Sequence, residues 1–467
     1  MAARVRLADV VVSGALALGP QRKPGANAAG LPLVRQKTLK LARRLPIDRN
    51  RVTVGKRRMI AAAQRMQPKI GLVLTGGGAR AAYQVGVLRA LAELVPKGAP
   101  SPFQIVCGTS AGAINATAIA TDASNFRRAV RRLLTVWKNF HAGHVYRADV
   151  RGIAACGARW LAAVLLGGLG KHNPVSLLDN SPLAELLSRH YSFAGIEHSI
   201  DAGHLTALAI TASSYGSGQS ITFFEGVSTL EDWKRARRVG VRAQLDVRHL
   251  MASAAIPFIF PPVAIEEKYF GDGSMRQIAP ISPSLHLGAD RVLIVSVSRA
   301  PNGNTSPPRR EDCPSLAQIG GHALNSIFID ALDADLERLD RINRTVARIP
   351  LAADRAAVNL KRVDYLLLSP SQELDQIAQR HVHALPWPVR FFLRGIGAMR
   401  RSGSNVASYV LFEKPFCRAL IRLGYQDTMA RRDEVRAFLG VGANMAAGAR
   451  ANAAPVDELR VPEFVGM

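Results

Sequence analysis

Two short apolar runs in this sequence each end in a glycine-rich turn and lead directly into a helical pattern. The first is KIGLVLT (69–75), followed by GGGAR and then by apolar residues at helical spacing over 81–95. The second is FQIVCG (103–108), followed by a short turn and a small-residue helix over 111–122. Strands that alternate with helices favour a largely parallel sheet covered by helices. The sequence therefore predicts a three-layer α/β/α fold with a central, mostly parallel sheet.

The rest of the chain continues this pattern. We expect further strands at 205–215, 220–226, 290–298 and 364–371, and further helices at 126–140, 316–346 and within 386–440. We expect an extended, turning path over 251–265, because its prolines break regular structure, and a turn at 269–275. The predicted parts of the chain are a poorly ordered basic extension (1–68), an α/β domain (69–300), a loop (301–315), a mostly helical C-terminal region packed on that domain (316–440) and a tail (441–467).

The net charge of the chain is +26, and +14 of it lies in residues 1–69. Such an excess attracts anionic surfaces, either phospholipid headgroups or nucleic acid, or else forms a solvated tail. We expect no nucleic-acid partner, because zinc-knuckle spacings and basic motifs interleaved with aromatic residues are absent from the sequence. The basic amphipathic segment 389–401 and the glycine-dotted apolar stretch 152–170 are candidates for contact with lipid, the second of them otherwise a buried or flap helix.

The four cysteines are isolated, which is typical of reduced thiols in a cytoplasmic protein. No run of about 18 uncharged apolar residues is present, so we expect peripheral contact with a membrane and no spanning segment. Residues 10–18 weakly resemble a secretory signal, and the Arg-rich N-terminus resembles an organelle transit segment, so composition leaves targeting open. No feature demands a metal ion or a cofactor, and the oligomeric state is not predicted.

The glycine stretch GGGARA (76–81) must hold backbone close to something negatively charged. It satisfies the dinucleotide pattern G-x-G-x-x-G/A, but the next strand ends at Val106-Cys107-Gly108-Thr109-Ser110 without the acidic residue that would hold a ribose. A Walker A site is excluded, because GK[ST] does not follow the glycines. A developing oxyanion is the remaining interpretation of this loop.

The segment GTSAG, from Gly108 to Gly112, matches G-x-S-x-G. In this pattern a serine occupies a sharp strand-to-helix turn, and glycines are needed because neighbouring side chains would block the turn. Ser110 would then lie at the N-terminus of the next helix, whose positive end favours the negative charge that develops during nucleophilic attack. Ser110 is therefore a candidate nucleophile.

A serine nucleophile needs a base, and the sequence offers two kinds. A Ser-His-Asp esterase of the α/β-hydrolase type would use a late histidine, His381 or His383. The segment Gly271-Asp272-Gly273-Ser274 offers Asp272 instead, in a turn where glycines allow close approach to another backbone turn.

Taken together, GGGARAAYQVGVL, GTSAGAINA and ASAAIPFIFPPVAI…YFGDGS resemble the patatin-like phospholipase family, over roughly residues 69–300. The resemblance implies a catalytic domain with a Ser110–Asp272 dyad and no catalytic histidine. It implies an oxyanion hole formed by the backbone of Gly76, Gly77, Gly78 and Ala79, with supporting roles for Arg80, Gly108, Gly112 and Gly273. Ala81 and Ser274 depart from the family pattern, and Ala81 fits if its φ is negative.

The resemblance also implies the activity. We expect a hydrolase of lipid metabolism that cleaves carboxylic esters of phospholipids, lysophospholipids or glycerides at an anionic phospholipid surface. A protein that kept this fold for lipid binding or scaffolding without catalysis is the alternative from another functional class.

Overall fold

The computed structural model describes residues 68–149, 152, 157–159, 165, 176–299, 316–349, 361–395, 398–399 and 404–441. The predicted extension over residues 1–68 lies outside the described residues except for its last residue. The predicted loop over 301–315, nearly all of the tail over 441–467, and most of the apolar stretch 152–170 also lie outside them.

The helices follow the chain in this order: η1 (Gly78–Ala81), α2 (Ala82–Leu94), α3 (Ala111–Ala120), α4 (Phe126–Lys138), η2 (Ala142–His144), α6 (Ser181–His190), α7 (Ala194–Asp201), α8 (Val247–Ser253), η3 (Gly273–Met275), α9 (Ser282–His286), α10 (Leu316–Asn325), the π-helical turn η4 (Ser326–Asp330), α11 (Ala331–Arg348), α13 (Leu374–His381), η5 (Val382–Ala384), α14 (Trp387–Gly395), α15 (Ser404–Val410), α16 (Lys414–Ala430) and α17 (Arg432–Leu439). The long helical region predicted at 316–346 is therefore present, with a π-helical turn inside it.

Five strands form the parallel part of the sheet. They lie in the order β10-β9-β1-β2-β3, with bounds Asp364–Leu368, Arg291–Val295, Ile70–Leu74, Ile105–Thr109 and Ala207–Ser214. All five include predicted apolar runs. The sequence predicts these strands well because a strand that is buried on both faces is a nearly continuous apolar run.

The sheet becomes mixed beyond β3. Here β3 pairs antiparallel with β4 (Ser220–Gly226), and β4 pairs with β6 (Arg238–Arg242), which in turn pairs with β5 (Trp233–Arg235). A separate hairpin of β7 (Val263–Ile265) and β8 (Lys268–Asp272) also joins β3. The predicted α/β fold with mostly parallel strands is confirmed.

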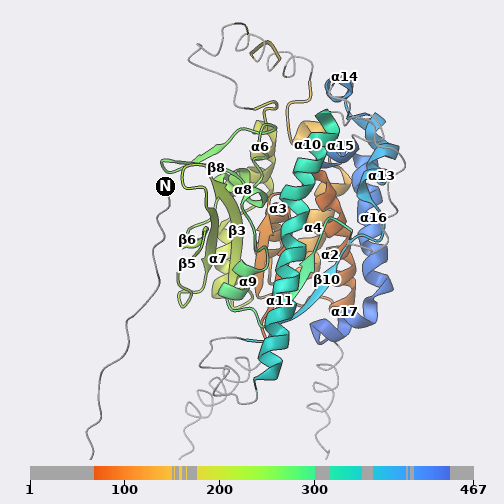
Figure 1. The fold of residues 1–467 in the computed structure, drawn as a ribbon. Coiled ribbons are helices and arrows are strands. Elements are labelled where there is room, and N and C mark those ends of the chain that lie inside the picture. Colours follow the sequence, from red (N-terminus) through yellow and green to blue (C-terminus); the bar gives the residue numbers. More distant parts are fainter. Residues whose placement is uncertain are drawn as a thin grey trace, which may run out of the picture. The chain divides into compact units, whose positions relative to one another are not determined.

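Helices cover both faces of the sheet. Leu72, Leu74 and Val106 point to one face, where they pack in the same core as α2, α3 and α4. Val73 and Cys107 alternate with them and pack on the other face with α11. Figure 1 shows α11 lying along that face and α2 beside α16. The alternation of side chains along each strand thus produces the three predicted layers.

Two local predictions are wrong. Residues 251–253 are the end of helix α8, because Asp246 caps its first turn by accepting from the N–H groups of Arg248 and His249. The prolines act only later, beginning at Pro257. Residues 269–272 belong to strand β8, so the predicted turn begins at Gly273.

The structure describes two of the four cysteines. Cys107 and Cys417 are buried and free, and burial raises the pKa of the Cys107 thiol to about 12. Cys156 and Cys313 lie outside the described residues.

The C-terminal helices pack tightly on the rest of the fold. A Cβ atom added at Gly424 of α16 would lie 2.2 Å from the backbone oxygen of Tyr83 in α2, and one added at Gly86 would lie 2.1 Å from that of Ile421. The two helices therefore cross with their backbones in direct contact. Strand β10 also completes the sheet beside β9, so residues beyond 316 share the hydrophobic core of the N-terminal strands.

Gly424→Ala should lower the free energy of unfolding by about 1–3 kcal/mol, because the added methyl group forces α16 away from α2. Urea denaturation checks this. Gly216→Ala is the matched control, since a Cβ there meets no atom within 4 Å. Equal stability of the two variants would show that the helices do not pack as described.

Candidate active site

Ser110 occupies the tight turn between β2 and α3. Its backbone has φ 55° and ψ −131°, a strained conformation for a residue other than glycine. The N–H of Ser110 donates to Ser253 Oγ at 2.8 Å, and that hydroxyl donates to the backbone oxygen of Thr211 at 2.6 Å. The buried Ser253 thus ties the turn to strand β3.

The flanking glycines allow this turn. Gly108 is the fourth residue of β2, and Gly112 is the second residue of α3. A Cβ atom at Gly112 would lie 2.4 Å from the backbone oxygen of Leu74, so only glycine lets the start of α3 approach the end of β1.

Strand pairing brings Asp272 to Ser110. Both β2 and β8 pair with β3, with Thr109 opposite Thr211 and Asp272 opposite Ala212, the next residue of β3. Because β2 runs parallel to β3 and β8 runs antiparallel to it, the C-terminal ends of β2 and β8 point toward each other. Ser110 and Asp272 therefore meet beside the middle of β3.

Asp272 is completely buried. Its Oδ1 accepts from the N–H of Ser274 at 2.9 Å, whereas Oδ2 has no hydrogen-bond partner of normal geometry among the described residues. Burial raises the pKa of Asp272 from 3.8 to about 6. The nearby hydroxyl of Ser110 and the contacts with Ser274 favour the ionised form and lower that pKa, but by less than burial raises it.

The glycine loop lies beside this pair. Gly78 and Ser110 line the same pocket, and a Cβ at Gly76 would lie 2.4 Å from Ser274 Oγ. Gly78 has φ +54°, which favours glycine. Gly77 precedes η1, and Gly78 and Ala79 are its first residues, so their N–H groups have no preceding helical turn to which they could donate.

Two departures from the family pattern fit this geometry. Ala81 has φ −63° and ψ −9°, an ordinary helical conformation for alanine. Ser274 places its backbone N–H on Asp272, and Gly273 follows Asp272 directly in η3.

Arg80 connects the glycine loop to the C-terminal helices. Its side chain is buried and donates to Asp375 of α13 at 2.5 Å and to Ser408 Oγ of α15 at 2.8 Å. The guanidinium also lies 4.0 Å from the ring centroid of Tyr409. The positive charge of Arg80 is therefore used within the protein to position the loop.

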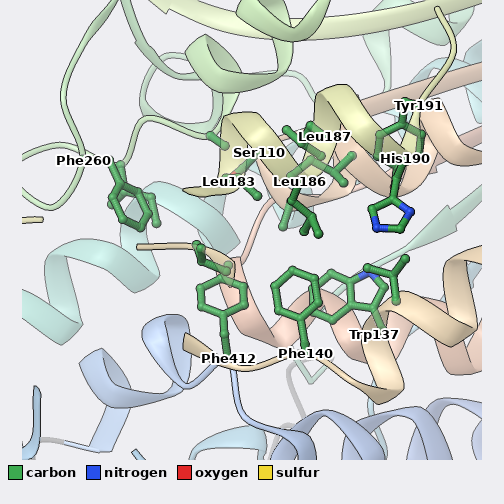
Figure 2. Close-up of a pocket in the computed structure, with 17 residues that line it drawn as sticks. Ser110, Trp137, Phe140, Leu183, Leu186, Leu187, His190, Tyr191, Phe260 and Phe412 are labelled. Atoms are coloured by element: carbon green, nitrogen blue, oxygen red, sulfur yellow. The ribbon is translucent and has the colours of Figure 1, made fainter. Parts of the chain in front are cut away.

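A narrow apolar pocket opens on Ser110. Figure 2 shows Leu183, Leu186 and Leu187 facing Phe412, Phe140 and Trp137 across it. In this view His190 and Tyr191 lie at one end, Phe260 lies at the other, and Ser110 lies between them. Such a pocket suits a hydrocarbon chain, because nearly all of its lining is aliphatic or aromatic.

The histidines considered from the sequence lie elsewhere. His381 ends α13 and His383 lies in η5, and neither lines the pocket. No histidine is among the groups that shift the pKa of Asp272. His190 is the one histidine among the described residues that line the pocket.

Several contributing residues had no clear sequence signal. Ser253, Asp375, Ser408 and Tyr409 lie far along the chain from the residues they hold. Ser253 could have been suspected from its place in the small-residue segment MASAA, but its partner could not.

No metal centre or spanning helix is found in the part of the chain that the structure describes. There, no three His, Cys, Asp or Glu side chains are grouped so as to hold a metal ion. Likewise, no described helix combines the length and apolar character needed to cross a membrane.

Known proteins resemble this chain in sequence. Residues 72–285 match the family model of the patatin-like phospholipases. A segment of 54 residues, 12% of the chain, is 52% identical to lysophospholipase nte1 of Aspergillus terreus and spans 3% of that protein's length.

Among solved structures, human GIVD cytosolic phospholipase A2 in complex with methyl γ-linolenyl fluorophosphonate aligns with a TM-score of 0.36 and 11% identity, over 84% of this chain and 64% of that one. The same enzyme with that inhibitor and terbium chloride gives a TM-score of 0.35 and 13% identity, over 80% of this chain and 59% of that one.

In its matched segments this chain is therefore similar to proteins described as phospholipases and lysophospholipases. The match to the patatin-like phospholipase model spans residues 72–285, which include Ser110 and Asp272.

Asp272→Asn should stabilise the protein at about pH 8, by on the order of 2–3 kcal/mol. Because the folded-state pKa of Asp272 is raised from 3.8 to about 6, the folded protein is favoured while this carboxyl is protonated, and that stability is lost as the pH rises between these values. Asparagine is neutral throughout, so the gain should disappear at about pH 4. Urea denaturation at both pH values measures it, and a gain that does not depend on pH would contradict the burial of an ionising group.

Proposed function

We propose that this protein hydrolyses carboxylic esters of lipids, with Ser110 as the nucleophile and Asp272 as its base. The observation that carries the proposal is the end-to-end approach of β2 and β8 along β3, which brings these two side chains together beside an apolar pocket. In the first step Ser110 Oγ attacks the ester carbonyl carbon and its proton passes to Asp272. Asp272 returns that proton to the leaving alkoxide as the ester C–O bond breaks, which releases the alcohol and leaves an acyl-enzyme on Ser110. Water then attacks the acyl carbonyl and gives a proton to Asp272, which passes it to Ser110 Oγ as the carboxylic acid is released.

The raised pKa of Asp272 supports this role. A carboxylate with a pKa of about 6 accepts a proton more readily than one at 3.8, and the unpartnered Oδ2 is free to take it. A serine hydroxyl is nevertheless a much weaker acid than a carboxyl group. Proton transfer must therefore accompany attack, and the oxyanion must be strongly stabilised.

The glycine loop supplies that stabilisation. Backbone N–H groups from Gly76 to Ala79 would donate to the oxyanion, and the N-terminus of α3 adds its positive end. Losing one such donor typically costs about 3–4 kcal/mol of transition-state stabilisation. Arg80 acts here as a positioning residue, because its buried bonds to α13 and α15 hold the loop in place.

Ser110→Ala and Asp272→Asn should each lower ester hydrolysis by on the order of a thousandfold or more, because each removes a group that acts in the transition state. His381→Ala and His383→Ala should stay within about threefold of the native rate. Initial rates with 4-nitrophenyl butyrate measure this. An equal loss in either histidine variant would favour a histidine-dependent esterase, and full activity of Ser110→Ala would refute the proposal.

The exposed face of helix α14 agrees with a lipid substrate. Val389 and Leu393 of α14 are buried, whereas Trp387 and Phe391 are 60% and 74% exposed on the opposite side of the helix. Arg394 is exposed beside these aromatic residues, and Arg390 is half-buried at the edge of this face, where it donates to the backbone oxygen of His383 at 3.2 Å. Aromatic and arginine side chains together suit the headgroup region of an anionic bilayer. We therefore include peripheral binding to anionic phospholipid, through α14, in the proposed function.

Arg390→Glu with Arg394→Glu should weaken binding to phosphatidylglycerol vesicles about tenfold or more, since each arginine near such a surface contributes about 1 kcal/mol. Arg341→Glu with Arg344→Glu is the matched control. It makes the same charge change on α11, whose C-terminal end lies far from α14 in Figure 1. Vesicle co-sedimentation measures binding, and equal effects of the two pairs would mean that net charge alone attracts the protein.

A further inference from the structure

One face of helix α3 leads away from Ser110 along two neighbouring hollows. Ala111 and Ile114 line the apolar pocket, whereas Ala118 and Thr121 line a second, outer hollow. These four residues lie on one face of the helix. A helix rises 1.5 Å per residue, so Ile114, Ala118 and Thr121 lie roughly 5, 10 and 15 Å beyond Ala111. Distance along α3 is therefore distance from the nucleophile.

Helix α6 gives the same order in the same direction. Leu183 and Leu187 line the inner pocket only, His190 lines both hollows, and Arg189 lines the outer hollow only.

Helix α4 runs the opposite way and agrees with this order. Trp137 lines the inner pocket, Val136 lines both hollows, and Leu133 and Ala129 line the outer one. On all three helices the inner pocket therefore meets the outer hollow at the same distance from Ser110, between Ile114 and Ala118.

The boundary consists of the three residues that line both hollows, Val136, His190 and Tyr191. We call these residues the end wall. Beyond it the chemistry changes, because the outer hollow contains Arg132, Arg189 and Asp122. Arg132 lies 3.6 Å from Asp122, and both arginine side chains are largely exposed. A hydrocarbon chain gains burial up to the end wall and meets charged groups and water beyond it.

We propose that the pocket between α3, α4 and α6 determines which acyl-chain lengths this protein prefers. The end wall sets the longest acyl chain that is fully buried. This inference rests on the proposed function, with the acyl carbonyl at Ser110 and the chain extending along α3. Each methylene group that becomes buried before the end wall should raise kcat/KM about fourfold. Methylene groups added beyond the end wall should bring no further gain.

Variants at two distances from Ser110 along the pocket test this proposal. Kinetics with 4-nitrophenyl butyrate, octanoate, dodecanoate and palmitate give kcat/KM against chain length. Ile114→Phe, close to Ser110, should lower kcat/KM for octanoate and longer esters at least tenfold relative to butyrate. Val136→Ala should move the optimum to longer chains, whereas Thr135→Ala, which alters only the outer hollow, should leave the profile unchanged. The proposal is overturned if Ile114→Phe and Val136→Ala change all four esters by the same factor.

A binding measurement separates this inference from the proposed function. Trp137 lines the inner pocket, so fatty acids brominated at successive carbons should quench its fluorescence in Ser110→Ala protein. The strongest quenching should come from bromine partway along the chain, and Trp137→Phe should abolish that dependence. If hydrolysis is absent in every assay but quenching still depends on the bromine position, the proposed ester hydrolysis is wrong and the proposed limit on chain length stands. If quenching is the same for every bromine position, the end wall does not limit the acyl chain, whether or not the protein is an enzyme.

Discussion

The backbone pairing of strand β3 is the interaction on which the candidate site depends. Along one edge, β3 bonds first to the parallel β2 and then to the antiparallel β8, so two strands distant in sequence end against each other. A shift of this pairing by one residue would turn every side chain of β8 to the other face of the sheet. The meeting of Ser110 and Asp272 therefore follows from main-chain register, and Ser253 strengthens it by linking the Ser110 turn to β3.

The site combines two features that are unfavourable for folding. Ser110 has a strained backbone, and Asp272 is a buried carboxyl group with one unpartnered oxygen. Both are held by a densely packed surrounding core, in which the residues of α3 from Ala111 to Ala113 are all buried. Strain and burial of this kind concentrate at functional sites because the same features that destabilise the fold tune a side chain for chemistry.

The C-terminal helices take part in the site although they follow the matched domain in sequence. Asp375 and Ser408 hold Arg80, and the backbone of Tyr409 lies against Gly78. Phe412 also forms part of the pocket lining. The patatin-like match over residues 72–285 therefore covers Ser110, Asp272 and the glycine loop but not the C-terminal residues that contact the loop.

The sequence by itself determined the five parallel strands and β4, most of the helices and the motifs, because apolar periodicity and glycine spacing are local properties of the chain. It predicted Ser110 at a strand-to-helix turn, and it offered both Asp272 and a late histidine as bases. It did not predict β5, β6 and the β7–β8 hairpin, because these short half-exposed strands lack a continuous apolar run. It also did not predict the helical end of α8, because the prolines that follow it led us to expect an extended path. Only the tertiary structure decided that β8 ends against β2, that Arg80 is neutralised by α13, and that three helices align their side chains along one pocket. These are contacts between segments far apart in the chain, and they depend on register and packing that no local pattern records.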